Sequence, residues 1–316
     1  MGVMVNGEWR ADEDFPRDAS GHFVRPVSPF RNWVTADGSP GPSGSGGFHA
    51  AAGRYHLIVS LACPWAHRAL IVRKLKGLES MISLSVVNWL MAGRGWTFDP
   101  GPGVIADPLF GFDTLADFYR KARPDFTGRV TVPVLWDRDT NTIVSNESSE
   151  IIRMFNSAFD AVGAAEGDYY PEDLRGEIDA LNDRIYATVN NGVYRAGFAT
   201  SQDAYEEAFR ALFETLDWLD ARLTVRQFLA GDRLTEADWR LFTTLVRFDP
   251  VYFGHFKCNL KQIRDYPALS RYLRELYRWP GVAETVDFFH IKHHYYESHR
   301  GINPTGIVPL GPEMAL

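Results

Sequence analysis

The sequence predicts an α/β domain followed by a domain built almost entirely of helices. Between residues 53 and 157, strand-like apolar runs alternate with helical patterns, and from about residue 171 onward the apolar residues recur at helical spacing. The 316 residues are enough for two domains, which we place at 53–160 and 171–300. Residues 301–316 are expected to form a tail.

Residues 1–52 are expected to form an irregular, aromatic-containing extension. It includes residues 37–47, which consist almost entirely of Gly, Ser and Pro. Such a stretch has too few apolar side chains to pack, so we interpret it as a flexible loop.

The α/β domain is predicted element by element from periodicity. Strands are expected at 55–61, 82–87, 130–136 and 142–144, and helices at 66–78, near 115–121 and from 146 through 155. Pro133 cannot donate to a ladder, so its strand belongs at a sheet edge or beside a ligand. The order β-α-β, β-β-α is that of a thioredoxin-like domain.

The second domain is predicted to contain helices at 171–190, 202–224, 235–248, 267–279 and 281–294. Thr235 and Asp238, three residues apart before an apolar run, form a variant of the capping box with Asp in place of Glu. We assign this pair to folding, because an N-cap typically contributes about 1 kcal/mol and no chemistry requires it.

The most informative feature is Cys63, which lies where the first strand becomes a helix, followed by Pro64 at a position that suits the first helical turn. Unpaired N–H groups and the helix dipole favour a thiolate there and can lower a thiol pKa from about 8.5 into the 3.5–7.5 range. A lone cysteine is more often a small buried hydrophobe. The strand, Cys-Pro and helix together favour a reactive thiol instead.

A two-cysteine redox motif would have a second cysteine at position 66, where this chain has Ala66. A single thiol can form a mixed disulfide, but an outside thiol must release it, and glutathione is the obvious one in a cell. Cys258, the only other cysteine, lies in an aromatic-rich stretch. It is either a packed core residue or a resolving partner.

Composition limits the partners and the compartment. With 33 basic and 40 acidic residues the net charge is −7, so the chain lacks the excess of basic residues that is typical of nucleic-acid-binding proteins. Two cysteines fit a reducing compartment rather than a disulfide framework. We find no signal peptide pattern and no apolar run near the ~18–20 residues that span a bilayer. We therefore expect a cytoplasmic protein that binds neither nucleic acid nor membranes.

These motifs together resemble the glutathione transferase superfamily, and most specifically its Xi class, the glutathionyl-hydroquinone reductases. The similarity extends from about Phe30 to Gly311. It rests on Cys63-Pro64-Trp65-Ala66 and on residues 93–96, 129–136, 146–148, 190–194, 245–252, 290–295 and 302–306. The resemblance implies the glutathione transferase fold, that is, a thioredoxin-like N-terminal domain followed by an all-α C-terminal domain, and it implies a homodimer.

The resemblance also implies a reaction. The Cys63 thiolate would attack the sulfur of a glutathionyl-hydroquinone, the ring would leave with a proton, and a second glutathione would resolve the mixed disulfide, releasing oxidised glutathione. Glutathione is then a co-substrate, and no metal is needed. The absence of a second cysteine at position 66 fits this scheme.

By the same resemblance, glutathione binds through a set of residues on the first domain. Val132, before a cis Pro133, would pair with the peptide like an added strand. Glu147 and Ser148 would hold the γ-glutamyl end at a helix start, where Glu147 could alternatively serve only the helix dipole. Trp96 would pack on glutathione, or else be half-buried under a loop. The segment also includes Arg129, Val130 and Thr131.

The resemblance gives the proton to a tyrosine, since a phenol can act as a general acid. It implies Tyr194 as that acid, with Tyr252 and Tyr295 nearby favouring the thiolate. Each of the three would otherwise be interpreted as a core residue with a satisfied hydroxyl.

His290, His293 and His294 have the i, i+3, i+4 spacing of helical metal ligands. Their aromatic neighbours Phe288, Phe289, Tyr295 and Tyr296 indicate a pocket or core instead. We therefore expect no metal.

Two other functions remain open. One is dehydroascorbate reduction or a thiol transferase activity, which also uses a lone cysteine and can be separated only by substrate assays. The other is a non-enzymatic interaction module of the same fold, which would not require Cys63, Glu147, Ser148 and Tyr194 together.

Overall fold

The computed structural model describes residues 2–11 and 16–316; the part of the expected extension at residues 1 and 12–15 lies outside them. The chain forms two compact units, each assembled from three segments. The first contains Met1–Asp14, Pro26–Gly167 and Thr285–His294, and the second contains Phe15–Arg25, Asp168–Glu284 and Tyr295–Leu316.

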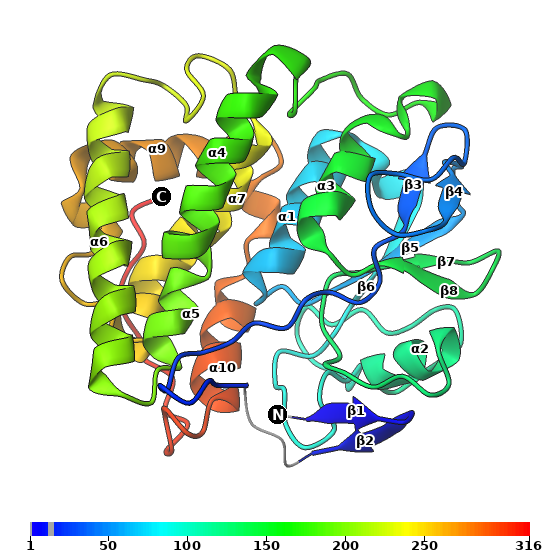
Figure 1. Cartoon of the computed structure of the whole chain (residues 1–316), viewed down its shortest axis with the longest axis horizontal. Helices are drawn as coiled ribbons and strands as arrows, with labels where there is room; N and C mark the ends of the chain where they lie inside the picture. The colour runs from blue at the N-terminus through cyan, green and yellow to red at the C-terminus, as the bar shows by residue number, and fades with distance from the viewer. Residues whose placement is uncertain (1, 12–15) are drawn as a thin grey trace. The chain divides into compact units, whose positions relative to one another are not determined.

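A four-stranded sheet with the order β6-β5-β7-β8 organises the first unit (Figure 1). β5 runs parallel to β6 and antiparallel to β7, and β7 pairs antiparallel with β8. Helices α1 and α3 pack against each other. The bounds are β5 Tyr55–Val59, α1 Pro64–Leu75, β6 Ile82–Val86, α2 Leu115–Ala122, β7 Val134–Asp137, β8 Thr142–Ser145 and α3 Ser148–Ser157. The thioredoxin-like order predicted from the sequence is confirmed.

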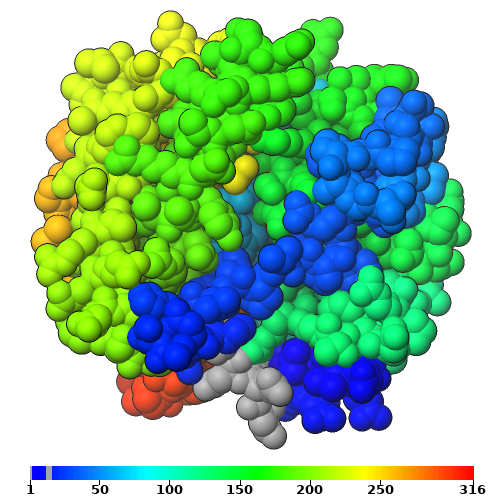
Figure 2. Space-filling view, in the orientation of Figure 1, coloured from blue at the N-terminus to red at the C-terminus, as the bar shows by residue number. Residues whose placement is uncertain are grey.

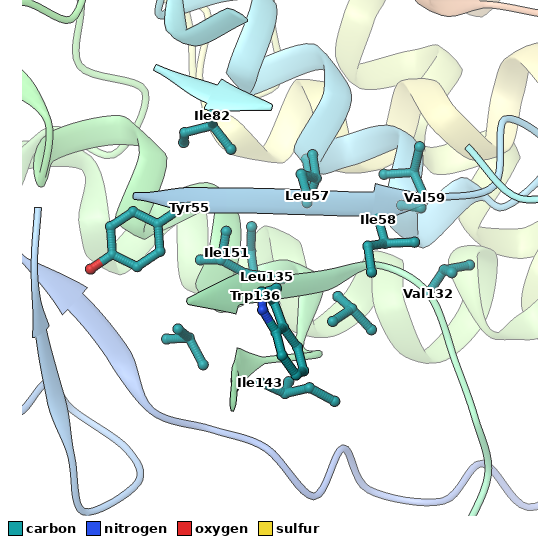
Figure 3. Close-up of a cluster of buried hydrophobic side chains, with 14 of the residues drawn as sticks. Tyr55, Leu57, Ile58, Val59, Ile82, Val132, Leu135, Trp136, Ile143 and Ile151 are labelled. Carbon is teal, nitrogen blue, oxygen red and sulfur yellow. The ribbon is translucent and has the colours of Figure 1, made fainter. Parts of the chain in front are cut away.

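The core of the first unit lies on both faces of this sheet. All five residues of β5 are buried, and Figure 3 shows Leu57 and Ile58 pointing to opposite sides of the strand. This is why the strand appears in the sequence as a continuous apolar run rather than an alternating one. A buried contact between His67 of α1 and Thr285, 2.8 Å between Nε2 and Oγ1, ties the late segment Thr285–His294 to this unit.

The strand around Pro133 differs from the prediction. β7 begins only at Val134, because Pro133 has no N–H to give to the ladder, and it lies between β5 and β8. The edge position allowed by the sequence is therefore wrong, and a position beside a ligand remains. The Val132–Pro133 peptide bond is cis.

The N-terminal segment is more regular than expected. β1 (Val3–Val5) and β2 (Glu8–Arg10) form an antiparallel hairpin, and β3 (Trp33–Thr35) pairs in parallel with β4 (Gly47–His49). The Gly- and Ser-rich loop between β3 and β4 is tied down. Ser43 Oγ donates to the backbone of Arg31 and accepts from the Trp33 indole, 3.0 and 2.8 Å.

Gly41 shows how closely that loop packs, since a Cβ there would lie 2.1 Å from the Trp33 side chain. On the face drawn in Figure 2 the loop contributes part of the blue surface. Close backbone approach explains the glycine content better than chain flexibility does.

The second unit is helical, as predicted, but several helices end earlier or begin later. The helix expected at 171–190 is divided into a 3₁₀ turn, α4 and a π-helical turn, and the helix expected at 281–294 is displaced to α10. The bounds are α4 Arg175–Ile185, α5 Gly192–Gly197, α6 Gln202–Thr224, α7 Glu236–Arg247, α8 Phe253–His255, α9 Pro267–Tyr277 and α10 Phe288–Ser298, with π turns Tyr186–Asn190 and Phe248–Tyr252 and 3₁₀ turns Leu78–Ser80, Asp160–Val162, Glu172–Leu174, Ile263–Asp265 and Ala283–Thr285.

Hydrogen bonds at the helix starts explain two of these boundaries. The capping box predicted at Thr235 and Asp238 is present, with both reciprocal bonds formed. At α10, Asp287 Oδ1 accepts from the backbone of His290 at 2.8 Å, which places the start of the helix after Asp287. Among the described residues, no helix has both the length and the apolar character required to cross a membrane.

Candidate active site

Cys63 is the N-cap residue of α1, with extended backbone angles and Pro64 at the first helical position. Its side chain is partly exposed, and Sγ lies 3.7 Å from the backbone oxygen of Val132. The predicted location of the thiol, at a strand-to-helix junction, is confirmed. Ala66, one turn on, is fully buried.

The segment that precedes the cis-proline faces this thiol. The β5–β7 ladder starts at Val134, so the backbone of Val132 lies outside it. The backbone of Thr131 is already engaged, since its N–H donates to the Tyr119 hydroxyl at 3.2 Å and its C=O accepts from it at 2.8 Å. Val130 is buried. Val132 is buried as well, and its carbonyl oxygen is the one that lies beside the Cys63 sulfur.

Glu147 is the N-cap of α3 and receives several hydrogen bonds. Its carboxylate accepts from Ser149 N at 3.1 Å, Ser149 Oγ at 2.8 Å and Ser28 Oγ at 2.9 Å. Burial opposes ionisation, but these bonds and the nearby Arg68 charge hold the pKa of Glu147 below its usual value. A partly exposed carboxylate that stays ionised can bind an ammonium group.

Two residues of this region were missed by the sequence reasoning. Arg68, buried in α1, places Nη1 3.4 Å from Ser148 Oγ and lies over the Trp65 ring. Ser28 comes from the segment expected to be irregular. Arg68 could have been suspected, because it lies one turn after Pro64 on the helix whose N-cap is Cys63.

Trp96 is almost fully buried and stacks on His294, with ring centroids 4.9 Å apart and an interplanar angle of 24°. His294 Nδ1 in turn lies 2.8 Å from the backbone oxygen of Trp89. The indole therefore has one face fixed by an imidazole. Arg129 is partly exposed and donates from Nη1 to the backbone oxygen of Gly2 at 3.0 Å.

The three predicted tyrosines come together in the second unit. The hydroxyl of Tyr295 lies 2.5 Å from that of Tyr194 and 3.0 Å from that of Tyr252. Tyr252 and Tyr295 are fully buried, and burial followed by the neighbouring phenols raises their pKa values well above the usual value. Tyr194 is partly exposed and is the member of the cluster able to meet a substrate.

Two guanidinium groups accompany the cluster. Arg25 lies over the Tyr194 ring, 4.8 Å from its centroid, and donates from Nε to Asn191 Oδ1 at 2.8 Å. Arg247 is fully buried, and its charge acts on Tyr252 and Tyr295 in the direction opposite to burial. The Arg247 charge favours negative charge on the phenol oxygens of Tyr252 and Tyr295.

The remaining candidates have other surroundings. Cys258 is free and fully buried, and burial raises its pKa, as expected for a core cysteine. His290 Nε2 lies 2.6 Å from the backbone oxygen of Pro102, and His293 stacks on Phe289. Within the part of the chain that the structure describes, no group of three or more His, Cys, Asp or Glu side chains is arranged to hold a metal ion.

Comparison with known families gives matches over both units. The family model of the glutathione S-transferase N-terminal domain matches residues 62–158, and that of the C-terminal domain matches residues 202–275.

The chain is 59% identical over 313 residues to glutathionyl-hydroquinone reductase YqjG of Escherichia coli (strain K12), which covers 99% of this chain and 95% of that protein. It is 55% identical over 316 residues to glutathionyl-hydroquinone reductase PcpF of Sphingobium chlorophenolicum. That alignment covers 100% of this chain and 98% of PcpF.

Solved structures agree. Glutathione-bound YqjG from E. coli K-12 superposes with a TM-score of 0.88 at 62% identity, over 90% of this chain and 93% of that one. The Xi class glutathione transferase of Natrialba magadii gives a TM-score of 0.91 at 50% identity, over 99% of this chain and 93% of that one.

Proposed function

The chain belongs to the Xi class of the glutathione transferase superfamily, and on this premise we propose that it reduces S-glutathionyl-hydroquinones to hydroquinones with glutathione. One observation carries the proposal beyond family membership. Cys63 is a partly exposed thiol at a helix N-terminus, and the place of a second redox cysteine is taken by the buried Ala66. A conjugating transferase has no need of such a thiol, whereas thiol exchange with glutathione requires one.

The reaction proceeds in two exchanges. The Cys63 thiolate attacks the glutathione sulfur of the substrate, and the carbon–sulfur bond to the ring breaks. The ring carbon keeps the electron pair and takes a proton, which gives the hydroquinone and a Cys63–glutathione disulfide. A second glutathione thiolate attacks that disulfide, forming oxidised glutathione and restoring the Cys63 thiolate.

Glutathione is held from both ends in this proposal. The ionised Glu147 binds the ammonium of the γ-glutamyl group, and Ser148 with the first N–H groups of α3 binds its carboxylate. The backbone of Val132 pairs with the peptide like an added strand. Val130 and Thr131 position that segment through burial and through Tyr119, and Trp96 and Arg129 contact the rest of the tripeptide.

Tyr194 supplies the proton to the departing ring. It is the exposed end of a hydrogen-bonded series in which Tyr295 and Tyr252 are buried behind it. Tyr295 and Tyr252 therefore act on the proton of Tyr194 rather than on the substrate.

Intact-mass spectrometry tests the proposal directly. Wild type and Cys63→Ala are incubated with a glutathionyl-hydroquinone and then with excess glutathione. We expect an adduct of about 305 Da on the wild type only, cleared by glutathione with release of hydroquinone. If neither adduct nor hydroquinone forms at any glutathione concentration, the reductase assignment fails, and dehydroascorbate becomes the next substrate to assay.

We also propose that the protein is a cytoplasmic homodimer. Family membership supports the dimer, and two free cysteines together with dependence on glutathione support a reducing compartment. Light scattering coupled to size-exclusion chromatography would give the mass of one 35.7 kDa chain if the dimer is wrong.

A further inference from the structure

The N-terminal hairpin of β1 and β2 contacts two of the segments that hold glutathione in the proposed function, those of Trp96 and Arg129. The first contact is with the loop before Trp96. Trp9 of β2 donates from its indole Nε1 to the backbone oxygen of Gly93 at 2.7 Å. Gly95 has a φ of +70°, and a Cβ there would lie 2.6 Å from the Trp9 ring. Only a glycine lets the loop approach the indole so closely.

The second contact is with the segment before Val130. Met4 exchanges a pair of backbone hydrogen bonds with Gly128, 3.0 and 2.9 Å, and the turn residue Gly7 donates to the oxygen of Phe126 at 3.0 Å. Arg129 itself donates to the backbone of Gly2. Met4 is fully buried, so this face of the hairpin is part of the core of the first unit.

The same hairpin contacts residues 93–95 and residues 126–129, although these two segments lie more than thirty positions apart in the sequence. In Figure 1 the hairpin lies beside α2, whose Arg120 donates from Nε to the backbone oxygen of Gly7 at 2.8 Å. The hairpin thus fixes the positions of the Trp96 loop and the Arg129 segment relative to each other. The Trp9 indole packs directly on Gly95 and its N–H is hydrogen-bonded, so the loop can move little relative to the hairpin.

We propose that Trp9 is a positioning residue for glutathione binding, which sets the affinity for the tripeptide by holding Trp96 and Arg129 in register. Trp9 touches no substrate; its effect is transmitted through Gly93, Gly95 and the hairpin backbone. A ligand pays less ordering entropy when its binding loops are already fixed, so loss of this support weakens binding rather than chemistry. The inference rests on the glutathione site of the proposed function.

The test is calorimetric binding of glutathione, carried out in a Cys63→Ser background so that no disulfide forms. We expect Trp9→Ala to raise the Kd about tenfold and Trp9→Phe, which keeps a ring but loses the N–H, to raise it about threefold. Glu8→Ala is the matched control, because Glu8 is exposed on the same strand, and it should leave the Kd unchanged.

A double-mutant cycle with Gly95→Ala identifies the contact. The added methyl meets the indole, so Gly95→Ala should weaken binding in the presence of Trp9 and weaken it much less after Trp9→Ala. With Cys63 restored, Trp9→Ala should raise the KM for glutathione while kcat at saturating glutathione stays within about twofold.

Two results overturn the inference: an unchanged Kd in Trp9→Ala, or additive effects of Trp9→Ala and Gly95→Ala on the Kd in the cycle. Neither bears on the reductase reaction, because the binding assay contains no hydroquinone. Conversely, a wild type that binds glutathione but releases no hydroquinone contradicts the proposed function and leaves this test intact.

Discussion

The charge of Glu147 is maintained by neighbours that no local sequence pattern specifies. Ser149 belongs to the same helix start and is visible in the sequence, but Ser28 is 119 positions away along the chain. The sequence predicted site roles for residues that lie within motifs, namely Cys63, Glu147 and Ser148. It could not indicate Ser28, because the contact of Ser28 with Glu147 arises from packing between distant segments.

Tyr194→Phe should lower turnover by about 10²–10⁴, the usual contribution of a general acid, while the Kd for glutathione stays within twofold. Removal of the hydroxyl takes away the proton donor and leaves the glutathione ligands of the first unit untouched. Steady-state kinetics with a glutathionyl-hydroquinone, together with glutathione binding, measure both quantities.

Tyr252→Phe serves as the comparison for this prediction. It removes a buried hydroxyl that contacts Tyr295, and it should have a smaller effect on turnover. Equal turnover in Tyr194→Phe and wild type would remove Tyr194 from the mechanism.

His56 predicts a pH dependence of stability. Burial, helped by the charges of Arg138 and Arg73 and opposed by that of Asp107, lowers the pKa of His56 to about 4 from 6.5. The unfolded chain therefore binds a proton as the pH falls through 6.5, while the folded chain does not until about 4. The contribution of His56 to the free energy of unfolding is therefore fully present above pH 6.5. It falls by up to about 3 kcal/mol as the pH is lowered to 4.

Denaturant unfolding between pH 7.5 and 4.5 measures this loss. In His56→Gln, whose side chain cannot titrate, the same fall in pH should lower the free energy of unfolding by less than in the wild type. A pH dependence identical to that of the wild type would show that His56 is not the group responsible.

Among the elements, the helix boundaries show where periodicity fails as a predictor. Apolar spacing continues through Tyr186–Asn190 and Phe248–Tyr252, yet both segments are π turns. Pro250 has no N–H for an α-helical bond, which accounts for the second. Helical periodicity therefore predicts that a helix exists but not where its hydrogen bonding changes. Both π turns adjoin the tyrosine cluster, in keeping with the frequent occurrence of such turns at functional sites.

The capping box of α7 is present as predicted, and both of its residues are fully buried. Asp238 is fully buried and accepts from Leu229 N, Thr235 N, Thr235 Oγ1 and the Tyr272 hydroxyl. Asp238→Ala should lower the free energy of unfolding by about 3 kcal/mol or more, because it leaves buried donors without an acceptor. Chemical denaturation measures the change.

Tyr272→Phe removes one of these four bonds and should cost about 1 kcal/mol. If Asp238→Ala costs no more than Tyr272→Phe, the backbone donors find other partners and the capping account is wrong.

At the scale of the whole molecule, hydrogen exchange can locate where glutathione acts. Added glutathione should slow amide exchange at the start of α3, around Val132 and, if the hairpin supports the site, in β1 and β2. Amides of α9 in the second unit should be unaffected. Mass spectrometry of peptic fragments of Cys63→Ser resolves these regions, and equal protection of α9 would indicate general stabilisation instead of a local site.

The composition of the two units was the part of the fold least accessible to prediction. Local patterns predicted the central sheet and most helices, because those elements are defined by short-range periodicity. No local pattern indicates that Thr285–His294 belongs with the first unit, since that depends on contacts such as His67 with Thr285.

α10 is shared between the units: its first seven residues, through His294, belong to the first and its last four, from Tyr295, to the second. Genetic exchange of a C-terminal half between distant relatives at the junction near residue 167 would therefore also replace the imidazole beneath Trp96 and the partner of His67. A recombinant of that kind has a first unit assembled from two parents. We therefore expect new substrate ranges to arise by point substitution more readily than by shuffling of domains.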